Sequence, residues 1–562
     1  MNARNNARGP AAFISPSSQR FTLPEAWSCS FSHTANRTSV IIYSNANEGA
    51  KDTRYHRYPG VILLRLRHIV LGLAITGLRA EVRLPAILSD HMLLQQGMPV
   101  RLWGTAAPNE TVSVRLPEQN LTVKAGSAGK WQVFLAPLKM GKPFEISVNS
   151  IVIHDVLVGD VWIGSGQSNM EFPMARTMNA SQEIAEASYP ELRLFTVKKA
   201  VSEQALDDVT GTWQLCTPDS VKNFSAVEYF FGREIWKTQH IPMGLIHSSW
   251  GGTPAQSWTA PPYLKEDPAL EIYLTGWQKS LDIYPTAKEN YDKQLAQWNE
   301  SAAAAKAAGK TPPNRPNPPQ GPGHPNTPSG LFNAMIAPLT SYAIRGALWY
   351  QGESNANPAG AWLYRRLMTS MIESCREAWG QGSFPFYFVQ LANFESNGWW
   401  PLLRESQNMT LELRNTGEAL AIDVGNPKDI HPTNKQEVGH RLALTARALT
   451  YGEKIEYSGP SFRELTVTGS NARLWFDHVG GGLQAKGGRL TGFSIAGADQ
   501  KFVAGEAVIN GDSVIVKSVD VPEPVAVRYA WQDNPAVTLY NNDGLPASSF
   551  RSDVWKDAKA LQ

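Results

Sequence analysis

The chain has 562 residues, of which 42% are hydrophobic and 18% charged, a composition that excludes a wholly disordered or collagen-like protein. At about 150 residues per domain, this length predicts three or four domains. The 52 Lys and Arg residues balance 50 Asp and Glu residues to a net charge of +2, which argues against a nucleic-acid-binding surface. The three cysteines form no Cys-x-x-Cys pair and no Cys/His cluster, so we expect neither a disulfide scaffold nor a metal site.

The first 80 residues divide into two parts. Residues 1–60 lack helical or strand periodicity, and we expect them to be disordered or an extension ahead of the true start. Residues 61–80 have the layout of a secretory signal, with basic Arg65–His68, apolar Ile69–Leu78 and then a small residue, Ala80. The apolar run is shorter than the roughly 20 residues that a membrane-spanning helix needs. We therefore expect cleavage after Ala80 and a secreted or periplasmic mature protein without a membrane anchor. The alternative is that Ile69–Leu78 forms a buried strand.

Residues 81–150 alternate short apolar segments with turns, as in Pro99–Trp103, Thr111–Arg115 and Lys130–Phe134. This period of two predicts a small antiparallel β-sandwich.

From residue 151 to about 452, predicted strands alternate with predicted helices. Such alternation indicates a largely parallel sheet with helices on both faces, which binds its ligand at the carboxyl ends of the strands. The strands are predicted at 161–163, 241–247, 343–350, 386–391 and 419–423, and the helices at 225–238, 361–379, 402–413 and 435–449.

One insertion, residues 284–330, interrupts this domain. Its first part, 284–309, is rich in Ala, Lys and Glu and predicts a helix, whereas the proline-rich remainder predicts an extended surface segment. Residues 453–562 return to short strands and predict a second small β-sandwich.

Four polar loops follow predicted strands, so we expect all four at one edge of the sheet. They are Gly164-Ser-Gly-Gln-Ser168, Ser248-Ser-Trp-Gly251-Gly252, Gln351-Gly-Glu353-Ser-Asn355 and Gly425-Asn-Pro-Lys-Asp429-Ile-His431. A serine nucleophile needs a base to take its proton, and that base needs a carboxylate to orient it. Ser168, His431 and Asp429 are the candidates for these three roles, and the paired glycines expose N–H groups that suit an oxyanion.

Several other residues compete for these roles. Asp423, at a predicted strand end, is the second candidate for the carboxylate. Ser513 follows a Gly-Asp pair, but Asn-Gly between two β-rich runs predicts a hairpin turn there, so we reject it as a nucleophile. His247 and His440 are interpreted as packing or hydrogen-bonding residues. Glu353 is expected to hold neighbouring loops together rather than to react.

The motifs Gly-Gln-Ser168-Asn-Met, Trp-Tyr-Gln351-Gly-Glu353-Ser-Asn355 and Asp429-Ile-His431-Pro resemble those of the SGNH hydrolases, and within them the sialate O-acetylesterase group. The resemblance extends from about Glu81 to the carboxyl terminus. It implies an α/β, flavodoxin-like, three-layer hydrolase domain flanked by two small β-sandwich domains. It also implies an oxyanion hole formed by the Ser168 N–H, a glycine N–H such as that of Gly252, and a side chain, for which Gln351 and Asn355 both qualify. The superfamily usually spaces its last motif Asp-x-x-His, whereas Lys428 stands at that aspartate position here.

The resulting hypothesis is a cofactor-independent serine esterase that removes acetyl groups from carbohydrates, with acetylated sialic acid as the substrate. Acetylated xylan or another polysaccharide is the alternative substrate. A hypothesis of another class is a secreted, non-catalytic carbohydrate-binding protein, but it does not explain why the Ser, Gln/Asn and Asp/His loops converge.

We expect removal of residues 1–80 to leave a soluble, active protein, because this stretch has no patterned core-forming segments and ends in a signal-like run. Gel filtration, circular dichroism and ester hydrolysis by the truncated chain test this expectation. An unfolded or insoluble product would show that Ile69–Leu78 is structural.

Overall fold

The computed structural model describes residues 81–555. The predicted extension 1–60, the signal-like segment 61–80 and Cys29 lie outside these residues. In the described part, the thiols of Cys216 and Cys375 are buried and free. No helix of that part is long and apolar enough to cross a membrane.

A seven-stranded run, in the order β13-β12-β11-β7-β10-β8-β9, forms the central sheet. Neighbouring strands pair in parallel, except for β9, which is antiparallel to β8. The strands are β7 (Ile151–Gly166), β8 (Tyr189–Thr196), β9 (Trp213–Cys216), β10 (Met243–Ser249), β11 (Gly346–Tyr350), β12 (Phe386–Val389) and β13 (Thr416–Ala419).

Helices cover both faces of this sheet, because alternate strand residues point to opposite sides. Trp162, Leu245 and Leu348 pack with the apolar sides of α4 and α9. Ile163 and Ala347 point the other way and pack with α7. The longer helices are α4 (Ala226–Gln239), α6 (Glu271–Ala307), α7 (Gly360–Trp379), α8 (Trp400–Met409) and α9 (Lys435–Leu449), and the short ones are α1 (Ser168–Glu171), α2 (Ala180–Ala185), α3 (Pro218–Val221) and α5 (Pro261–Glu266).

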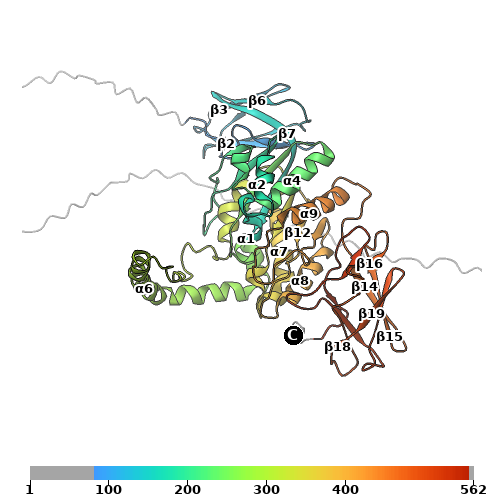
Figure 1. Ribbon diagram of the computed structural model, residues 1–562. Helices are drawn as coiled ribbons and strands as arrows, with labels where there is room; N and C mark the ends of the chain where they lie inside the picture. Colours follow the sequence, from blue (N-terminus) through green and yellow to red (C-terminus); the bar gives the residue numbers. More distant parts are fainter. Residues whose placement is uncertain (1–80, 556–562) are drawn as a thin grey trace, which may run out of the picture. The chain divides into compact units, whose positions relative to one another are not determined.

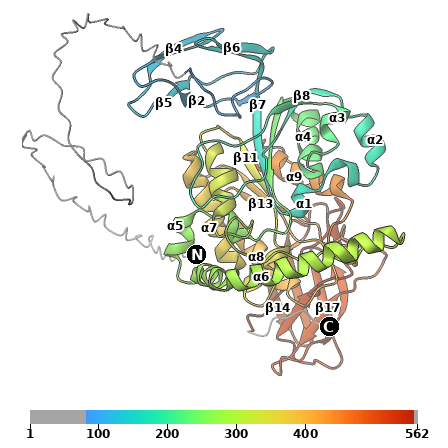
Figure 2. The same ribbon diagram turned by 90° about the vertical axis from the view of Figure 1, so that its left-hand side faces the viewer.

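Helices α4 and α9 begin where capping side chains satisfy free backbone N–H groups. The Ser225 side chain accepts a hydrogen bond from the Glu228 N–H at the start of α4, and Asn434 accepts one from the Glu437 N–H at the start of α9. The helix predicted at 435–449 is confirmed at both ends. The helix predicted at 284–309 starts earlier, at Glu271, and α6 contains no buried residue (Figure 2).

The strand predicted at 419–423 is wrong in its position, because β13 ends at Ala419. The chain then turns, with the Val424 N–H donating to the Ala421 carbonyl, and the Asp423 carboxylate pairs with Arg441 of α9. The apolar pattern of residues 419–422 arises because these residues are buried in the turn, not because they continue the strand.

Short strands precede the central sheet, and the first half of β7 pairs with two of them, β1 and β6 (Figure 1). Figure 2 shows β7 leading from these strands into the central sheet. The predicted boundary at 150/151 coincides with the first residue of a strand that both sheets share. These strands are β1 (Leu93–Gln95), β2 (Val100–Thr105), β3 (Thr111–Leu116), β4 (Gln119–Lys124), β5 (Lys130–Leu135) and β6 (Phe144–Val148).

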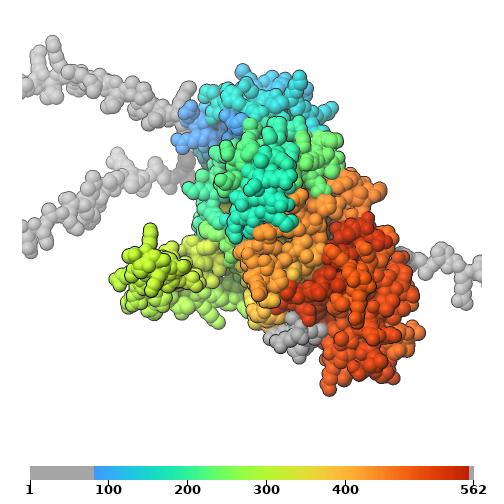
Figure 3. Space-filling view, viewed as in Figure 1, coloured from blue at the N-terminus to red at the C-terminus, as the bar shows by residue number. Residues whose placement is uncertain are grey.

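After α9 the chain forms two four-stranded sheets, β14-β15-β20-β19 and β18-β17-β21-β23, and a two-stranded pair, β16-β22. This segment (red in Figure 3) contacts the α/β part through Arg551, which pairs with Glu405, and through Arg404, which donates to the Gln532 and Asp533 carbonyls. Its strands are β14 (Ser461–Thr468), β15 (Asn471–Asp477), β16 (Leu483–Ala485), β17 (Phe493–Ala496), β18 (Val503–Ala504), β19 (Glu506–Asn510), β20 (Ser513–Lys517), β21 (Ala526–Tyr529), β22 (Leu539–Asn541) and β23 (Phe550–Arg551).

Candidate active site

The four predicted loops meet at the carboxyl edge of the central sheet, and hydrogen bonds connect them. The Ser354 N–H donates to the Gln167 side chain at 3.2 Å, and the Asn169 side chain donates to the Ile430 carbonyl at 3.0 Å. The Gly251 N–H donates to Glu171 at 2.6 Å. Residues that lie far apart in the sequence are therefore held together in one structure.

Ser168 is the first residue of α1, immediately after a sharp turn that ends β7. At Gly166, φ is +135°, and a Cβ there would lie 2.2 Å from the Tyr350 carbonyl oxygen. Only glycine fits this position, both because of the backbone angle and because β11 is so close. The turn leaves Ser168 half-buried, while Gln167 and Asn169 beside it are buried.

Ser168 and His431 line the same cavity, which has a volume of about 640 Å³. The ends of β8 and β10 and the loop after α1 supply most of its other walls. Three cationic side chains also line it, namely Arg176, Lys198 and Lys199. Lys199 pairs with Glu171 at 2.5 Å, whereas Arg176 has no ion-pair partner within residues 81–555 and lies over the Phe172 ring.

Asp429 and His431 are neighbours through a tight turn. The Asp429 Oδ1 atom lies 3.6 Å from the His431 Nδ1 atom and accepts the His431 backbone N–H at 2.9 Å. Burial lowers the pKa of His431, the Asp429 charge raises it, and the charges of Lys435 and Arg176 lower it further. The net pKa lies below the usual histidine value, so the ring is neutral and able to accept a proton at neutral pH.

Asp423 makes different contacts. Its two oxygens accept hydrogen bonds from Arg441 at 2.6 and 3.0 Å, and one also accepts the Tyr540 hydroxyl at 3.1 Å. Arg441 holds the pKa of this carboxyl below its usual value, although burial opposes the shift. Asp423 thus joins α9 to the C-terminal strands and does not contact His431.

The residues predicted to donate hydrogen bonds to the oxyanion do not come together at one place in the structure. The Gly251 N–H is committed to Glu171, while Gly252, with φ of +77°, follows it in the turn. The Gln351 amide donates to the Thr253 carbonyl and to Asn355 Oδ1, and the Asn355 amide donates to Gln256. Neither Gln351 nor Asn355 lines the cavity that contains Ser168.

A buried polar network lies beside Ser168, and the sequence pattern indicated only one of its members. The Asn169 amide donates to Glu353 at 2.5 Å and its oxygen accepts from Lys435 at 2.5 Å. Burial raises the pKa of Glu353 and lowers that of Lys435 to about 7. Glu353 connects loops, as its position in the sequence suggests. Asn169 could have been found from its place beside Ser168, but Lys435 has no local signal.

The competing residues also have defined positions. Ser513 starts β20 and donates to the Asn510 carbonyl across the predicted hairpin turn. His440 pairs with Glu234 at 2.7 Å and does not line the cavity. His247, at the end of a predicted strand and so a possible neighbour of the site, does line the cavity, and it is a hydrogen-bonding residue as interpreted from the sequence.

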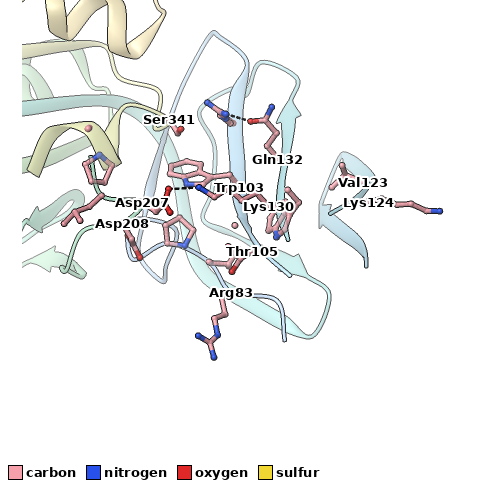
Figure 4. Close-up of a pocket in the computed structure, with 18 residues that line it drawn as sticks. Arg83, Trp103, Thr105, Val123, Lys124, Lys130, Gln132, Asp207, Asp208 and Ser341 are labelled. Carbon is pink, nitrogen blue, oxygen red and sulfur yellow. Dashed lines mark hydrogen bonds and ion pairs between the residues drawn. The ribbon is translucent and has the colours of Figure 1, made fainter. Parts of the chain in front are cut away.

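A larger cavity, of about 770 Å³, lies among β2, β5 and the loop that contains Asp207 (Figure 4). Trp103 and the Lys130–Asp207 ion pair line it, but none of the predicted site residues does. Within residues 81–555, no group of three or more His, Cys, Asp or Glu side chains is placed to hold a metal ion.

Known proteins with a similar sequence and a similar α/β fold are carbohydrate esterases. The family described as carbohydrate esterase, sialic acid-specific acetylesterase, matches residues 325–448. A solved carbohydrate acetylesterase from Xanthomonas citri superposes with a TM-score of 0.72 at 39% identity, covering 84% of this chain and all of that one.

Relatives of known activity match over nearly the whole described chain. The sialate O-acetylesterase of Mus musculus is 31% identical in an alignment of 555 positions, which covers 88% of this chain and 98% of that protein. The sialate O-acetylesterase of Homo sapiens is 32% identical in an alignment of 520 positions, which covers 82% of this chain and 90% of that protein. The chain belongs to the sialate O-acetylesterase family and is a carboxylic ester hydrolase.

Replacing Asp429 with Asn is expected to lower kcat by about 10²–10⁴, because the neutral amide neither orients His431 nor stabilises its protonated form. Asp423→Asn should cost far less kcat and instead lower the melting temperature, since it weakens the contact to Arg441. Steady-state kinetics and thermal unfolding of both variants separate the two. A crippled Asp423→Asn enzyme beside a nearly normal Asp429→Asn enzyme would contradict the assignment.

The pH dependence of kcat/KM should reflect the lowered pKa of His431. Since the base must be neutral, activity toward a neutral ester falls only below the usual histidine pKa. Arg176→Gln removes a positive charge that disfavours the protonated ring, so the pKa rises and the acidic limb moves to higher pH. Rate profiles with 4-nitrophenyl acetate measure this shift. Lys310→Gln, which removes a charge from an exposed site away from the cavity, should leave the limb in place.

Proposed function

We propose that the protein removes O-acetyl groups from carbohydrates through a covalent acyl-enzyme formed on Ser168. The observation that carries this proposal is that Ser168 and His431 line one cavity, with Asp429 oriented toward the His431 ring. Ser168 and His431 are both half-buried rather than enclosed, so an ester group on a sugar can reach the hydroxyl.

The reaction follows from the roles of the two residues. The Ser168 Oγ atom attacks the acetyl carbonyl carbon while His431 takes the hydroxyl proton. The tetrahedral intermediate then collapses, and His431 passes the proton to the departing sugar oxygen. Water attacks the acetyl-Ser168 carbonyl, His431 again moves the proton, and acetate leaves with Ser168 regenerated. The Ser168 N–H is the backbone donor for the negatively charged oxygen in both halves. Gly252, the second backbone donor expected from the sequence, does not line the cavity.

The preferred substrate in this proposal is an acetylated sialic acid, and the support is the charge of the cavity. A sialic acid carries a carboxylate, which a guanidinium binds well through paired hydrogen bonds. Arg176 lines the cavity without an ion-pair partner within residues 81–555. Arg366 pairs with Asp267 and Arg404 donates to carbonyls, and neither of them lines the cavity.

A neutral acetylated polysaccharide, such as acetylxylan, is the second candidate substrate. The Xanthomonas citri relative, which is described only as a carbohydrate acetylesterase, favours keeping it. Membership of an esterase family favours either substrate over the non-catalytic carbohydrate-binding hypothesis.

Three further parts of the proposal rest on the sequence. The hydrolase domain is of the SGNH type, and the flanking β-rich segments are each a small β-sandwich. The mature protein is secreted or periplasmic, on the basis of the signal-like residues 61–80. It acts without a cofactor on an acetylated carbohydrate, with neither nucleic acid nor membrane as a partner of the mature form.

Ser168→Ala should lower kcat by on the order of 10⁴ to 10⁶ without unfolding the protein, because the residues of such a site act as a unit. Hydrolysis of 4-nitrophenyl acetate and labelling by a fluorophosphonate, located by peptide mass spectrometry, measure the loss and identify the nucleophile. More than a tenth of the normal activity in this variant would rule Ser168 out.

Arg176→Gln should raise KM for an acetylated sialoside by about 10- to 100-fold, since a charge-assisted hydrogen bond contributes roughly 1.5–3 kcal/mol. KM for acetylated xylo-oligosaccharides should not change. Acetate release from both substrates by both enzymes provides the comparison. Equal effects on the two substrates would favour the neutral polysaccharide as the natural substrate.

A further inference from the structure

A second serine and histidine face the cavity that contains Ser168 and His431. His247 lies in β10, and its Nε2 atom is 3.0 Å from the Ser249 Oγ atom. Its Nδ1 atom is 2.5 Å from the Oε1 atom of Glu228, which lies in α4. His247 and Ser249 both line the cavity. Glu228, His247 and Ser249 thus form a hydrogen-bonded relay that ends at the cavity wall.

The residues around Glu228 and His247 leave room for the two side chains and hold them in place. His247 pairs in register with Gly164 of β7, and a Cβ on Gly164 would lie 2.1 Å from the Glu228 Cδ atom. A glycine at this place in the central strand therefore makes room for a carboxyl group inside the fold. The Phe224 ring packs edge-on against His247 at 5.7 Å between ring centres. The Glu228 and His247 side chains are 1% and 7% exposed, so both are fixed by packing.

The contacts of Glu228 indicate where the protons lie. Its Oε2 atom is buried, and no group in residues 81–555 donates a hydrogen bond to it. A charged carboxylate with one unpartnered buried oxygen is much more costly than a neutral acid. Burial raises the pKa of Glu228, although the His247 charge and the hydrogen bonds of His247 and Ser225 oppose the shift. In the neutral form, Oε1 carries the proton and donates it to His247 Nδ1.

This arrangement determines the tautomer of His247. When Nδ1 accepts a hydrogen bond, Nε2 carries the ring proton and donates it to the Ser249 oxygen. The Ser249 oxygen is then occupied as an acceptor from the ring, and its own O–H is free to donate. Because Ser249 lines the cavity, the acceptor available to that O–H is an atom of the bound substrate.

We propose that the Ser249 hydroxyl is a hydrogen-bond donor to the oxyanion formed from the substrate ester, and that His247 and Glu228 position it. This inference rests on the proposed function, since it needs Ser168 as the nucleophile. A side-chain donor is called for here, because the Gly251 N–H is committed to Glu171 and neither Gln351 nor Asn355 lines the cavity. Ser249 is separated from the Gly251-Gly252 turn by one residue, and it pairs in register with Gly166, two residues before Ser168.

Ser249→Ala is the first test. Loss of one oxyanion donor costs about 10²–10³ in kcat, so we expect a fall of that order with KM changed by less than about threefold. The matched control is Ser248→Ala, because the Ser248 hydroxyl is also buried but donates to the Met335 carbonyl and does not line the cavity. The control should keep the normal kcat. A Ser249→Ala enzyme with more than a third of the normal kcat overturns the proposal.

Glu228 variants test the tautomer. In Glu228→Gln the amide N–H can still donate to His247 Nδ1, so the relay keeps its direction and kcat should stay within about threefold of normal. Glu228→Met cannot donate, so kcat should fall toward the Ser249→Ala value. A Glu228→Gln enzyme as impaired as Ser249→Ala would show that Glu228 is a charged acceptor, which overturns the proposed direction of the relay.

The same set of variants separates this inference from the proposed function. If Ser168→Ala is inactive and Ser249→Ala retains a normal kcat, the nucleophile assignment stands and the donor role fails. If Ser168→Ala keeps its activity and the fluorophosphonate labels Ser249, the proposed function itself fails, because Ser249 is then the nucleophile. Labelling at Ser168 with a kcat-specific loss in Ser249→Ala supports both.

Discussion

The geometry of the site depends on the hydrogen bonds of one buried amide, that of Asn169. Its N–H group donates to Glu353 and to the Ile430 carbonyl, and its oxygen accepts from Lys435. Because Asn169 directly follows Ser168 and Ile430 directly precedes His431, this side chain fixes the two proposed reacting residues relative to each other. The acid and the amine that surround the amide are each bonded to it, while the Glu353 Oε2 atom is buried without a hydrogen-bond partner in residues 81–555.

Contacts with the C-terminal segment also help to hold the candidate site in place. Arg404 donates to the carbonyls of Leu391 and Ala392 in the α/β part and of Gln532 and Asp533 in the C-terminal part. The loop that follows Leu391 in turn contacts the segment that leads to His431, through the Glu395 N–H to the Pro427 carbonyl and the Gly425 N–H to Asn393. The burial that lowers the pKa of Arg404 to about 9 indicates how completely this junction excludes water. The position of the proposed base therefore depends on contacts with a region that contributes no residue to the cavity.

The sequence predicted strands β7, β10, β11 and β12 in their order along the chain, because the parallel sheet is buried on both faces and leaves a strong apolar pattern. It did not predict β8 and β9, which form one edge of the same sheet. It also predicted that four loops would meet, since that conclusion needs only the direction of parallel strands. It misplaced the strand before Asp423, because a buried turn and a buried strand have the same composition. It indicated neither Lys435 nor the contact of Ser249 with His247 and Glu228, because these depend on which side chains face each other across elements that are distant in the chain. For the same reason, the sequence could not decide whether Gln351 or Asn355 is the side-chain oxyanion donor. In the structure, both amides donate to groups outside the cavity, Gln351 to the Thr253 carbonyl and Asn355 to Gln256.

Strand β7 has 16 residues, which correspond to about 50 Å of extended chain. Its first half pairs with β1 and β6, and its second half pairs with β10 and β11 before it reaches Ser168. The leading strands and the central sheet cannot be separated without breaking hydrogen bonds, because they share β7 and no linker lies between them. Genetic recombination that exchanged the leading β-rich segment for an unrelated one would have to preserve the register of β7, so the structure disfavours exchange of this segment as an independent unit.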